Sequence, residues 1–493
     1  MYDKKYMITK LKRKGLLAFV SGILLAMAMP GFPFGAVVFV GLIPLFFGLE
    51  GGRGFGVGWW TGLTLFGLDL RWFLTLWRFS PLTPIALAAL VIYFSLYLGA
   101  FGWGVNFARR RFGEVQATLL AAPLLYAGLE ILRAHGPLGS CFSDLYLGLY
   151  RMPFLIQWAS VVGPWGITAA IVFVNGAIYL WWKTKRITYL AVAAGMFVIM
   201  AAGSLLPVQM GGKPIKAAVI SSDIPQSMKL DARNLFLLLS RYTALGQEAA
   251  NLHPDLIVYP ESILPAYILE DADLFHHFSF LAKTAGCSVL LGTGDLRKGK
   301  IYNSVVLISP DGGISGIYDM VHPVPFGEYI PWRSFIDRIG LGRFAASFLP
   351  VDLARGHSFS PLEGIGTPIC FESTFPAPAR RFVHNGADIL VTVTNDAWFD
   401  KSSELPVHFA FAVFRAVENR RYLIQAANGG ISGVVDPKGY IVKIIHGEGV
   451  LSAEVQRESG RSPYSAVGEW PLYACFGFVV LLALSKRGGW RGV

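Results

Sequence analysis

The chain has 493 residues, of which 54% are hydrophobic and only 15% are charged. Soluble globular proteins average about 25% charged residues, so this composition argues against an ordinary soluble protein and predicts membrane spans. The net charge of +11 does not indicate nucleic-acid binding, because the basic residues are scattered over the edges of apolar segments rather than gathered in one patch.

Long uncharged segments run from Gly15 to Leu49, Phe79 to Ala108, Met152 to Trp182 and Ile187 to Gly212. Each can cross a bilayer, which needs about 20 apolar residues. The first fits two crossings, with 30-PGFP-33 turning the chain between them. No convincing small-residue cleavage site follows it, so we expect an anchor rather than a removed signal peptide. Eight spans are predicted, with approximate ends at 15–31, 34–49, 55–76, 84–107, 116–133, 163–182, 188–208 and 467–485.

The third and fifth predicted spans carry charges near their ends, namely Asp69, Arg71, Glu130 and Arg133. Two interpretations are open. These residues mark helix ends at the membrane interface, or they line a cavity for lipid.

Basic clusters predict the orientation of the spans. They precede span one and follow spans four, six and eight, at 4–14, 109–111, 183–186 and 486–491. All four clusters lie on one side if both termini are cytoplasmic. Residues 213–466 are then extracytoplasmic.

The pattern of the sequence changes at Lys213, where short runs rich in β-forming residues begin to alternate with helical stretches. This alternation predicts a layered α/β domain. The predicted strands lie at 216–222, 255–262, 287–295, 303–313, 366–373, 388–396 and 431–439, and the predicted helices at 231–251, 272–285, 376–385 and 405–419. We therefore expect a membrane domain of seven helices at 1–212, an α/β domain at 213–466, and a last helix with a short tail at 467–493.

Three polar residues of the α/β domain are candidates for chemistry. Glu261 follows the apolar run 256-LIVYP-260, Cys370 follows 367-TPI-369, and Glu328 lies in the loop 318-YDMVHPVPFGEYIP-331. Taken alone, each has an ordinary interpretation: Glu261 as a strand end or helix cap, Cys370 as a small core residue, and Glu328 as a surface residue. Taken together, they suggest a thiol that loses its proton to a carboxylate and attacks a carbonyl.

The other cysteines are Cys141, Cys287 and Cys475, and no spacing among the four suggests a metal site. No histidine stands at a persuasive place beside Cys370, although His322 and His408 are conceivable partners. The proline loop is expected to be stiff, because Pro323, Pro325 and Pro331 fix φ and remove backbone donors, while Gly327 permits a tight bend.

Several motifs, taken in order, resemble those of the apolipoprotein N-acyltransferase family, membrane proteins whose catalytic domain belongs to the nitrilase superfamily. The motifs are 224-IPQSMK-229, 259-YPES-262, 302-YNS-304, 323-PVPFGEYIP-331, 369-ICFE-372 and 395-NDAWF-399. The resemblance covers essentially the whole chain. It implies about eight transmembrane helices and an extracytoplasmic nitrilase-like α-β-β-α sandwich.

The resemblance also implies roles for site residues. In the family triad of Glu, Lys and Cys, Glu261 matches the general base and Cys370 the nucleophile. Glu328, Phe371 and Glu372 match residues that support the active site. Met320 occupies the position of the family lysine, eight residues before the loop glutamate. The alternative is that Met320 is a plain core residue, and that backbone amides or another cation such as Lys401 complete the site.

The function implied is transfer of a fatty acyl chain from a membrane phospholipid, through a thioester on the cysteine, to the N-terminal diacylglyceryl-cysteine of a lipoprotein. Neither a cofactor nor a metal is implied, and the location implied is the bacterial inner membrane, with the catalytic domain on the periplasmic side. Two alternatives remain: a degenerate member of the family that binds phospholipid or lipoprotein, which Met320 favours, and a membrane-tethered nitrilase-type amidase. A transporter is a more distant alternative, because the spans contain few paired charges.

Overall fold

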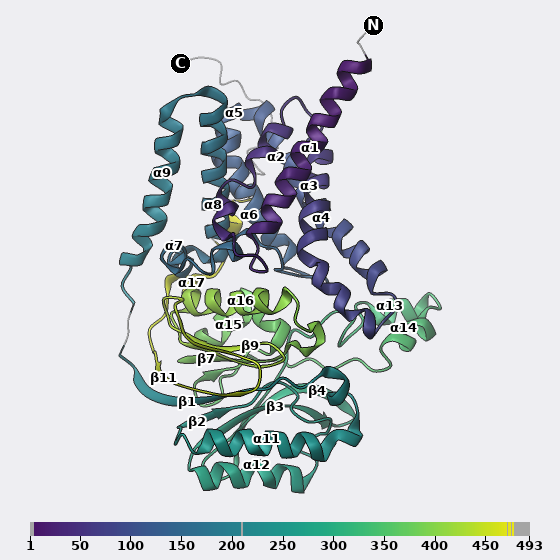
Figure 1. Cartoon of the computed structure of the whole chain (residues 1–493), viewed down its shortest axis with the longest axis vertical. Coiled ribbons are helices and arrows are strands. Elements are labelled where there is room, and N and C mark those ends of the chain that lie inside the picture. Colours follow the sequence, from purple (N-terminus) through teal and green to yellow (C-terminus); the bar gives the residue numbers. More distant parts are fainter. Residues whose placement is uncertain (1–3, 209–210, 471, 475, 478–493) are drawn as a thin grey trace. The chain divides into compact units, whose positions relative to one another are not determined.

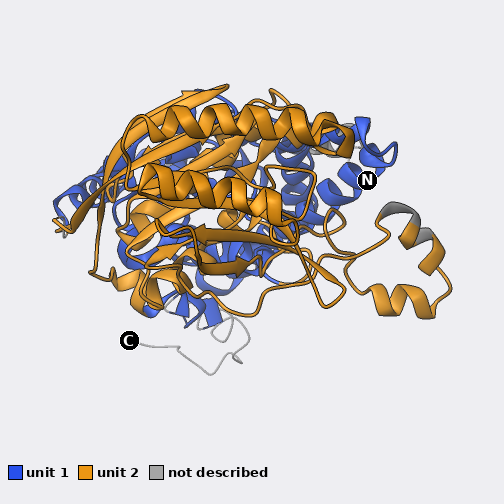
Figure 2. Ribbon diagram, turned by 90° about the horizontal axis from the view of Figure 1, so that it is seen from below, with its two compact units in different colours: residues 1–135, 141–206, 467–493 blue, residues 136–140, 207–466 orange. Residues whose placement is uncertain are grey.

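The computed structural model describes residues 4–208, 211–470, 472–474 and 476–477. It contains two compact units, shown in different colours in Figure 2. Unit 1 is formed by the described parts of 1–135, 141–206 and 467–493, and unit 2 by those of 136–140 and 207–466.

Unit 1 is helical. Its main helices are α1 (Lys4–Ala28), α2 (Ile43–Gly48), α3 (Gly54–Asp69), α4 (Thr83–Phe112), α5 (Glu114–Gln116), α6 (Ala122–Arg133), α7 (Pro153–Ile156), α8 (Ala159–Thr184) and α9 (Ile187–Ala202) (Figure 1). Within the described parts of the chain, four helical segments are long and apolar enough to cross a membrane: Thr83–Phe112, Glu114–Arg133, Ala159–Thr184 and Ile187–Leu205. They coincide with the predicted spans 84–107, 116–133, 163–182 and 188–208.

The remaining predicted spans have different outcomes. Span 15–31 falls on α1, and span 55–76 falls on α3 and the 3-10 helix Leu70–Arg78 that continues it. Span 34–49 is not one helix. It consists of a 3-10 turn, Gly35–Phe39, and α2, because Pro44 has no amide hydrogen to continue the first turn. Most of span 467–485 lies outside the described residues, so the count of eight stays a prediction.

A buried polar network fills the interior of unit 1. Arg133 pairs with Asp144, and its guanidinium also lies over the rings of Phe66 and Phe94, 5.1 and 5.0 Å from their centroids. The Glu130 carboxylate accepts hydrogen bonds from the amide of Leu145 and the hydroxyl of Thr168, at 2.8 and 2.7 Å. Ser143 donates to Asp69 at 2.6 Å.

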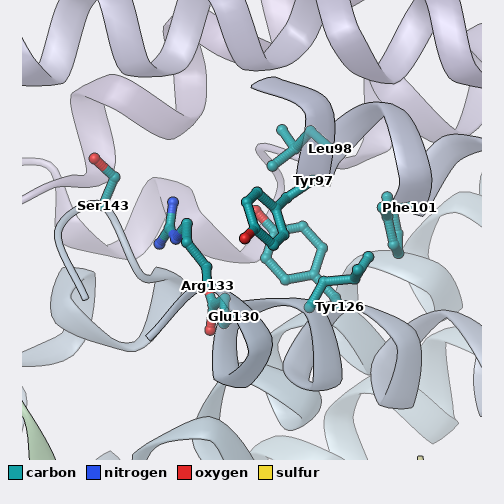
Figure 3. Close-up of a pocket in the computed structure, with 8 residues that line it drawn as sticks. Tyr97, Leu98, Phe101, Tyr126, Glu130, Arg133 and Ser143 are labelled. Atoms are coloured by element: carbon teal, nitrogen blue, oxygen red, sulfur yellow. The ribbon is translucent and has the colours of Figure 1, made fainter. Parts of the chain in front are cut away.

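This network shows where the charges lie. Asp69 and Arg133 are the last residues of α3 and α6, and both are buried inside the helical unit together with Glu130, whereas Arg71 is exposed. Glu130 and Arg133 border a narrow pocket lined with aromatic side chains, which include Tyr97 (Figure 3). Because the protein's own donors and acceptors engage the charged groups, their visible effect is to hold residues 143–145 against the helices.

Unit 2 is a sandwich of two β-sheets between two layers of helices. One sheet has the order β11-β1-β2-β3-β4-β5, and the other has the order β10-β9-β8-β7-β6. The strands are β1 (Lys213–Ser221), β2 (Leu256–Val258), β3 (Ser288–Arg297), β4 (Lys300–Ile308), β5 (Ile314–Asp319), β6 (Ile365–Gly366), β7 (Ile389–Asn395), β8 (Leu423–Asn428), β9 (Ile431–Val435), β10 (Ile441–His446) and β11 (Gly449–Arg457).

Helices α11 (Leu235–Ala250) and α12 (Ala272–Ala285) cover the first sheet, and α15 (Pro376–His384) and α16 (Glu404–Asn419) cover the second (Figure 1). The core between α11, α12 and the first sheet includes Leu238, Tyr259 and Phe278, all fully buried. Strands β1, β2 and β3 are parallel, as expected of apolar runs that are buried on both faces. The α-β-β-α sandwich expected from the family resemblance is therefore confirmed.

The predicted helices of this unit agree with α11, α12, α15 and α16, but the predicted strands need corrections. Strands β5, β8, β10 and β11 were not predicted. Of the predicted run 366–373, only Gly366 belongs to a strand, β6, and the run ends in the 3-10 helix Cys370–Thr374. An apolar run is ambiguous between buried strand and buried turn, and here the backbone must turn at Cys370 to present its side chain.

Candidate active site

The two sheets each contribute a central residue of the site. Glu261 follows β2 of the six-stranded sheet, and Cys370 follows β6 of the five-stranded sheet. The Glu261 carboxylate accepts a hydrogen bond from the Cys370 thiol. The two residues that the sequence proposes as base and nucleophile thus lie in contact, although 109 positions separate them along the chain.

The backbone of Cys370 adopts a left-handed conformation, with φ of 45°. Such a conformation is uncommon for any residue other than glycine and is typical of strained positions at functional sites. The turn is held from behind, because the carbonyl oxygen of Cys370 accepts hydrogen bonds from Ser373 Oγ at 2.7 Å and from His408 Nε2 at 3.2 Å. Residue 370 therefore has a fixed orientation.

Asn303, on β4, bridges the two glutamates of the site. Its side-chain amide donates to Glu261 Oε1 at 2.6 Å and to Glu328 Oε1 at 3.1 Å. The other oxygen of Glu328 accepts a hydrogen bond from the amide of Val324 at 2.7 Å. The amide of Asn303 thus fixes the orientation of the Glu261 carboxylate and connects it to the proline loop.

Met320 lies directly beside this bridge. Its side chain is buried, and its sulfur is 3.7 Å from Nδ2 of Asn303. The backbone is tied on both sides, because the amide of Met320 donates to the Asn303 carbonyl at 2.9 Å and its carbonyl accepts from Gly356 at 2.8 Å. An uncharged thioether therefore occupies the space next to the two glutamates.

Glu372 holds the start of the proline loop rather than the thiol. Its buried carboxylate accepts hydrogen bonds from the Tyr318 hydroxyl at 2.7 Å and from the amides of Val321 and His322 at 3.1 and 3.2 Å. The ring of Phe371 packs against Phe375, with centroids 5.1 Å apart. These two residues shape the surroundings of Cys370, and they are not part of the cluster formed by Glu261, Asn303 and Glu328.

The tip of the proline loop is a tight hairpin, in which the amide of Phe326 donates to the carbonyl of Tyr329 at 2.7 Å. The residue with the left-handed conformation is Phe326, with φ of 61°, and not Gly327 as the sequence suggested. The ring of Phe326 is exposed. The stiff loop therefore holds Glu328 on one side and presents an aromatic side chain on the other.

Lys229, at the end of the short helix α10 (Gln226–Lys229), is a site residue that the sequence did not single out. Its side chain is only 6% exposed, and its ammonium donates to the backbone carbonyl of Glu261 at 3.0 Å. Its charge faces Glu261 and Cys370. Lys401, which the sequence offered as another possible cation, is exposed.

Behind Cys370 lies a second buried cluster. His408 Nδ1 is 2.8 Å from Asp396 Oδ1 and 3.7 Å from Glu404 Oε1. Within the described part of the chain these three residues are also the group whose ligand atoms lie closely enough to hold a metal ion. Asp396 is already engaged by His408 and by the Thr394 hydroxyl, so the structure shows the cluster as a hydrogen-bonded support for the nucleophile turn.

Burial raises the pKa of the Cys370 thiol well above its usual range, and the neighbouring Glu261 and Asp396 carboxylates raise this pKa further. Burial also raises the pKa of Glu261, against the opposing effects of Asn303 and Lys229. Burial and the charge of Glu261 raise the pKa of Glu328 to about 7. Burial lowers the pKa of Lys229 to about 8, although Glu261 and Cys370 oppose this effect.

Sequence reasoning missed Lys229, Asn303 and Asp396, although all three stand in the motifs 224-IPQSMK-229, 302-YNS-304 and 395-NDAWF-399. The signal was therefore present as a motif. The sequence could not show that the strand ends of two different sheets meet. That meeting brings these residues close to the thiol.

Comparisons with known proteins identify the family. The model for the apolipoprotein N-acyltransferase N-terminal domain matches residues 21–177, and the carbon-nitrogen hydrolase model matches residues 217–463. An apolipoprotein N-acyltransferase of Geobacter metallireducens is 32% identical over 508 aligned positions, which cover 97% of this chain and 96% of the relative. The chain belongs to the apolipoprotein N-acyltransferase family.

Further apolipoprotein N-acyltransferases agree with this assignment. The protein of Shewanella oneidensis is 29% identical and covers 83% of this chain, and that of Photobacterium profundum is 29% identical and covers 85%. These alignments cover 81% and 83% of the two relatives.

Solved structures of the nitrilase superfamily are also similar to part of the chain. Nit3 of Saccharomyces cerevisiae is 22% identical, with a TM-score of 0.38, and covers 52% of this chain and 95% of its own. An amidase from Nesterenkonia is 16% identical, with a TM-score of 0.38, and covers 54% of this chain and 97% of its own.

Proposed function

We propose that this protein is an apolipoprotein N-acyltransferase, which moves a fatty acyl chain from a membrane phospholipid to the N-terminal amine of a diacylglyceryl-cysteine lipoprotein. The observation that carries the proposal is the hydrogen bond between the Cys370 thiol and the Glu261 carboxylate. In this arrangement a base lies in contact with the nucleophile whose proton it accepts. The relatives that align along almost the whole chain carry the same name.

In the first half-reaction, Glu261 accepts the thiol proton as Sγ of Cys370 attacks the ester carbonyl carbon of the phospholipid. The tetrahedral intermediate collapses, the bond from that carbon to the glycerol oxygen breaks, and the leaving oxygen takes the proton from Glu261. The products are a lysophospholipid and a thioester on Cys370. The raised pKa of Glu261 suits a residue that must both accept and return a proton near neutral pH.

In the second half-reaction, the lipoprotein amine attacks the thioester carbonyl. Glu261 takes the proton from the attacking nitrogen and returns it to the departing sulfur. The amide product leaves, and the free thiol is restored. No cofactor takes part in either step, and the proposal includes no metal.

The other site residues support this chemistry. Asn303 and Glu328 fix the Glu261 carboxylate. Glu372 and Phe371 shape the turn and the loop around Cys370. Met320 fills the position where the family resemblance implies a lysine.

The proposed location is the bacterial inner membrane, with the catalytic domain 213–466 on the periplasmic side, the membrane domain at 1–212 and a last span at 467–493. The basic clusters at the predicted membrane edges support this orientation. Both proposed substrates lie in the membrane, so a membrane domain in the same chain as the catalytic domain suits their delivery.

Mass spectrometry of the full-length protein, purified in detergent and incubated with phospholipid, tests the proposal. We expect a fatty-acyl adduct that maps to Cys370 and disappears when a diacylglyceryl-cysteine peptide is added, with the acylated peptide as product. Failure to form an adduct, with donors that acylate a relative under the same conditions, would contradict it.

One observation favours a second function, a lipid-binding family member without catalysis. Met320 leaves two glutamates beside the thiol without the ammonium that the family triad implies. This alternative predicts that phospholipid and lipopeptide bind with no adduct on Cys370, so the same experiment separates the two.

A further inference from the structure

The charges around Cys370 are unbalanced toward the negative. Glu261, Glu328 and Asp396 all raise the pKa of the thiol, and Met320 contributes no charge. Against the lowering effect of burial, Asp396 raises the pKa of His408 to about 9, but this positive charge pairs with Asp396 and contacts the carbonyl of Cys370 rather than its thiol. A cysteine attacks as the thiolate, so carboxylates alone make attack harder. The reaction proposed above needs a positive charge near Sγ.

Lys229 places one there. The residue is only 6% exposed, its ammonium donates to the backbone carbonyl of Glu261 at 3.0 Å, and its charge interacts with Glu261 and Cys370. Burial of an ammonium is unfavourable unless partners compensate it. An ammonium has three N–H donors, and the described residues show one hydrogen bond for this one, to a neutral carbonyl. The remaining donors are available within the site.

The helix that carries Lys229 is anchored to the site. Gln226, three residues earlier on α10, accepts a hydrogen bond from Asn395 at 2.8 Å. Asn395 in turn accepts one from Asn428 at 2.8 Å, and Asn428 accepts one from the amide of Ile224 at 2.9 Å. Lys229 therefore sits on a segment that is joined to the strand ends of the five-stranded sheet that carries the nucleophile.

We propose that Lys229 supplies the positive charge that stabilises the Cys370 thiolate in this protein, in place of the lysine absent at position 320. The inference rests on the proposed acyl transfer and adds to it the origin of the cation. The competing explanation is that Lys229 only tethers the Glu261 segment through its hydrogen bond to the Glu261 carbonyl. The two explanations differ in what happens when a lysine is restored at position 320.

A double-mutant cycle with Lys229→Met and Met320→Lys separates them. The readout is the rate of alkylation of Cys370 by iodoacetamide at pH 7 in the full-length protein, followed by peptide mass mapping. It reports the thiolate and needs no lipid substrate. Lys216→Met is the matched control, because the ammonium of Lys216 also donates to a backbone carbonyl, that of Leu252, at 2.6 Å.

We expect Lys229→Met to slow alkylation by about tenfold or more in the unmodified chain and by less than about threefold in the Met320→Lys background. Lys216→Met should change neither rate. An equal loss of alkylation rate in both backgrounds would show that Lys229 only tethers the Glu261 segment. No loss in either would show that Lys229 does not affect the thiol. Either result overturns the proposal. Acyl transfer measured on the same variants should follow the same pattern, and its absence from all of them would contradict only the proposed function.

If Lys229→Met fails to fold, the pH profile of the unmodified chain provides the test. The alkylation rate should rise with pH and flatten near pH 8, where Lys229 loses its proton and the thiolate loses its stabilising charge. Glu328, whose pKa is about 7, and His408, whose pKa is about 9, also disfavour the thiolate when they lose their protons, so the profile is repeated with Glu328→Gln, in which the bend near pH 8 should persist. A tenfold rise for every pH unit from 6 to 10 would overturn the proposal.

Discussion

At the scale of single residues, the site has two features. The Cys370 thiol contacts the Glu261 carboxylate, and the uncharged Met320 lies nearby, where a positive charge would favour the thiolate. The uncharged sulfur of Met320 lies 3.7 Å from the amide that bridges Glu261 and Glu328. If position 320 is that of the family lysine, as the resemblance implies, the departure at this site is electrostatic. Substitutions that change the charge at positions 320 and 370 are therefore the informative ones.

The first prediction concerns the identity of the nucleophile. Cys370→Ser should abolish the thioester, because serine has no sulfur to carry one, and its hydroxyl, which ionises far less readily than a thiol, should form little oxygen ester in its place. Cys287→Ser should keep it, since Cys287 is buried in the core beside α12 and the first sheet. Mapping of the acyl adduct by mass spectrometry measures both. A thioester retained in Cys370→Ser would move the nucleophile to another cysteine.

The second prediction concerns Met320. Met320→Lys should raise the rate of Cys370 acylation by at least about tenfold, since the ammonium would stabilise the developing oxyanion, and loss of one oxyanion donor typically costs about 10²–10³ in rate. Methionine and lysine are similar in length, so the fold should survive. Met320→Leu is the control, which keeps an apolar side chain and should give no gain. A slower reaction in Met320→Lys would mean that the buried space does not accept an ammonium.

At the scale of elements, the proline loop and the nucleophile turn are held together by buried carboxylates. Glu372 receives amide hydrogen bonds from the loop at Val321 and His322, and Glu328 receives one at Val324. Burial raises the pKa of both glutamates to about 7. Part of the stability of unit 2 therefore depends on protons that these side chains retain.

The third prediction follows from the sign of this effect. An unfolded glutamate loses its proton near 4.5, whereas the folded ones keep theirs until about pH 7. The stability that they contribute is full below pH 4.5 and is lost as the pH rises to 7. We expect the melting temperature of the protein to fall from pH 5 to pH 8, and Glu328→Gln to reduce that fall. Exposed Glu248→Gln should leave the profile unchanged, and a melting temperature that rises over this range would contradict the assignment.

The sequence predicted some elements well for a physical reason. Strands β1, β3 and β7 are buried over most of their length and rich in apolar residues, and helices α11 and α12 each present an apolar stripe to the core, so the sequence pattern predicts them. Strand β10 was missed because its residues are mostly exposed, and the run after Gly366 was taken as strand because a buried turn is equally apolar.

The same limit applies to the site. Glu261 and Cys370 could be identified because each ends an apolar run within a recognisable motif. Lys229 could not, because a lysine at the end of a four-residue helix normally faces solvent, and only the tertiary fold buries it against Glu261.

At the scale of the whole molecule, the helical unit and the sandwich unit present different chemistries. The helical unit buries Arg133, Glu130 and Asp69 in a network of its own, and the sandwich unit contains the thiol. A protein acting on two lipid-anchored substrates needs the thiol on the side of the membrane where the lipoprotein amine is found.

The fourth prediction tests that side. In intact cells, a maleimide that cannot cross membranes should label Lys443→Cys, at an exposed position of β10, and should not label Arg110→Cys, at the exposed end of α4. The expectation comes from the basic clusters, one of which contains Arg110. Permeabilised cells serve as the control, in which both should react. Labelling with the opposite preference would invert the orientation and remove the lipoprotein as a substrate.

The left-handed backbone at Cys370 has a consequence for the history of this protein. A side chain with a β-carbon held at φ of 45° costs the native state about 1–2 kcal/mol, which glycine at the same place would not. Mutation without selection for chemistry tends to relax such positions, since relaxation stabilises the fold. A chain that only bound lipids would therefore gain stability from glycine at this position. Cys370 instead occupies a strained turn braced by His408 and Ser373, an arrangement typical of residues that react.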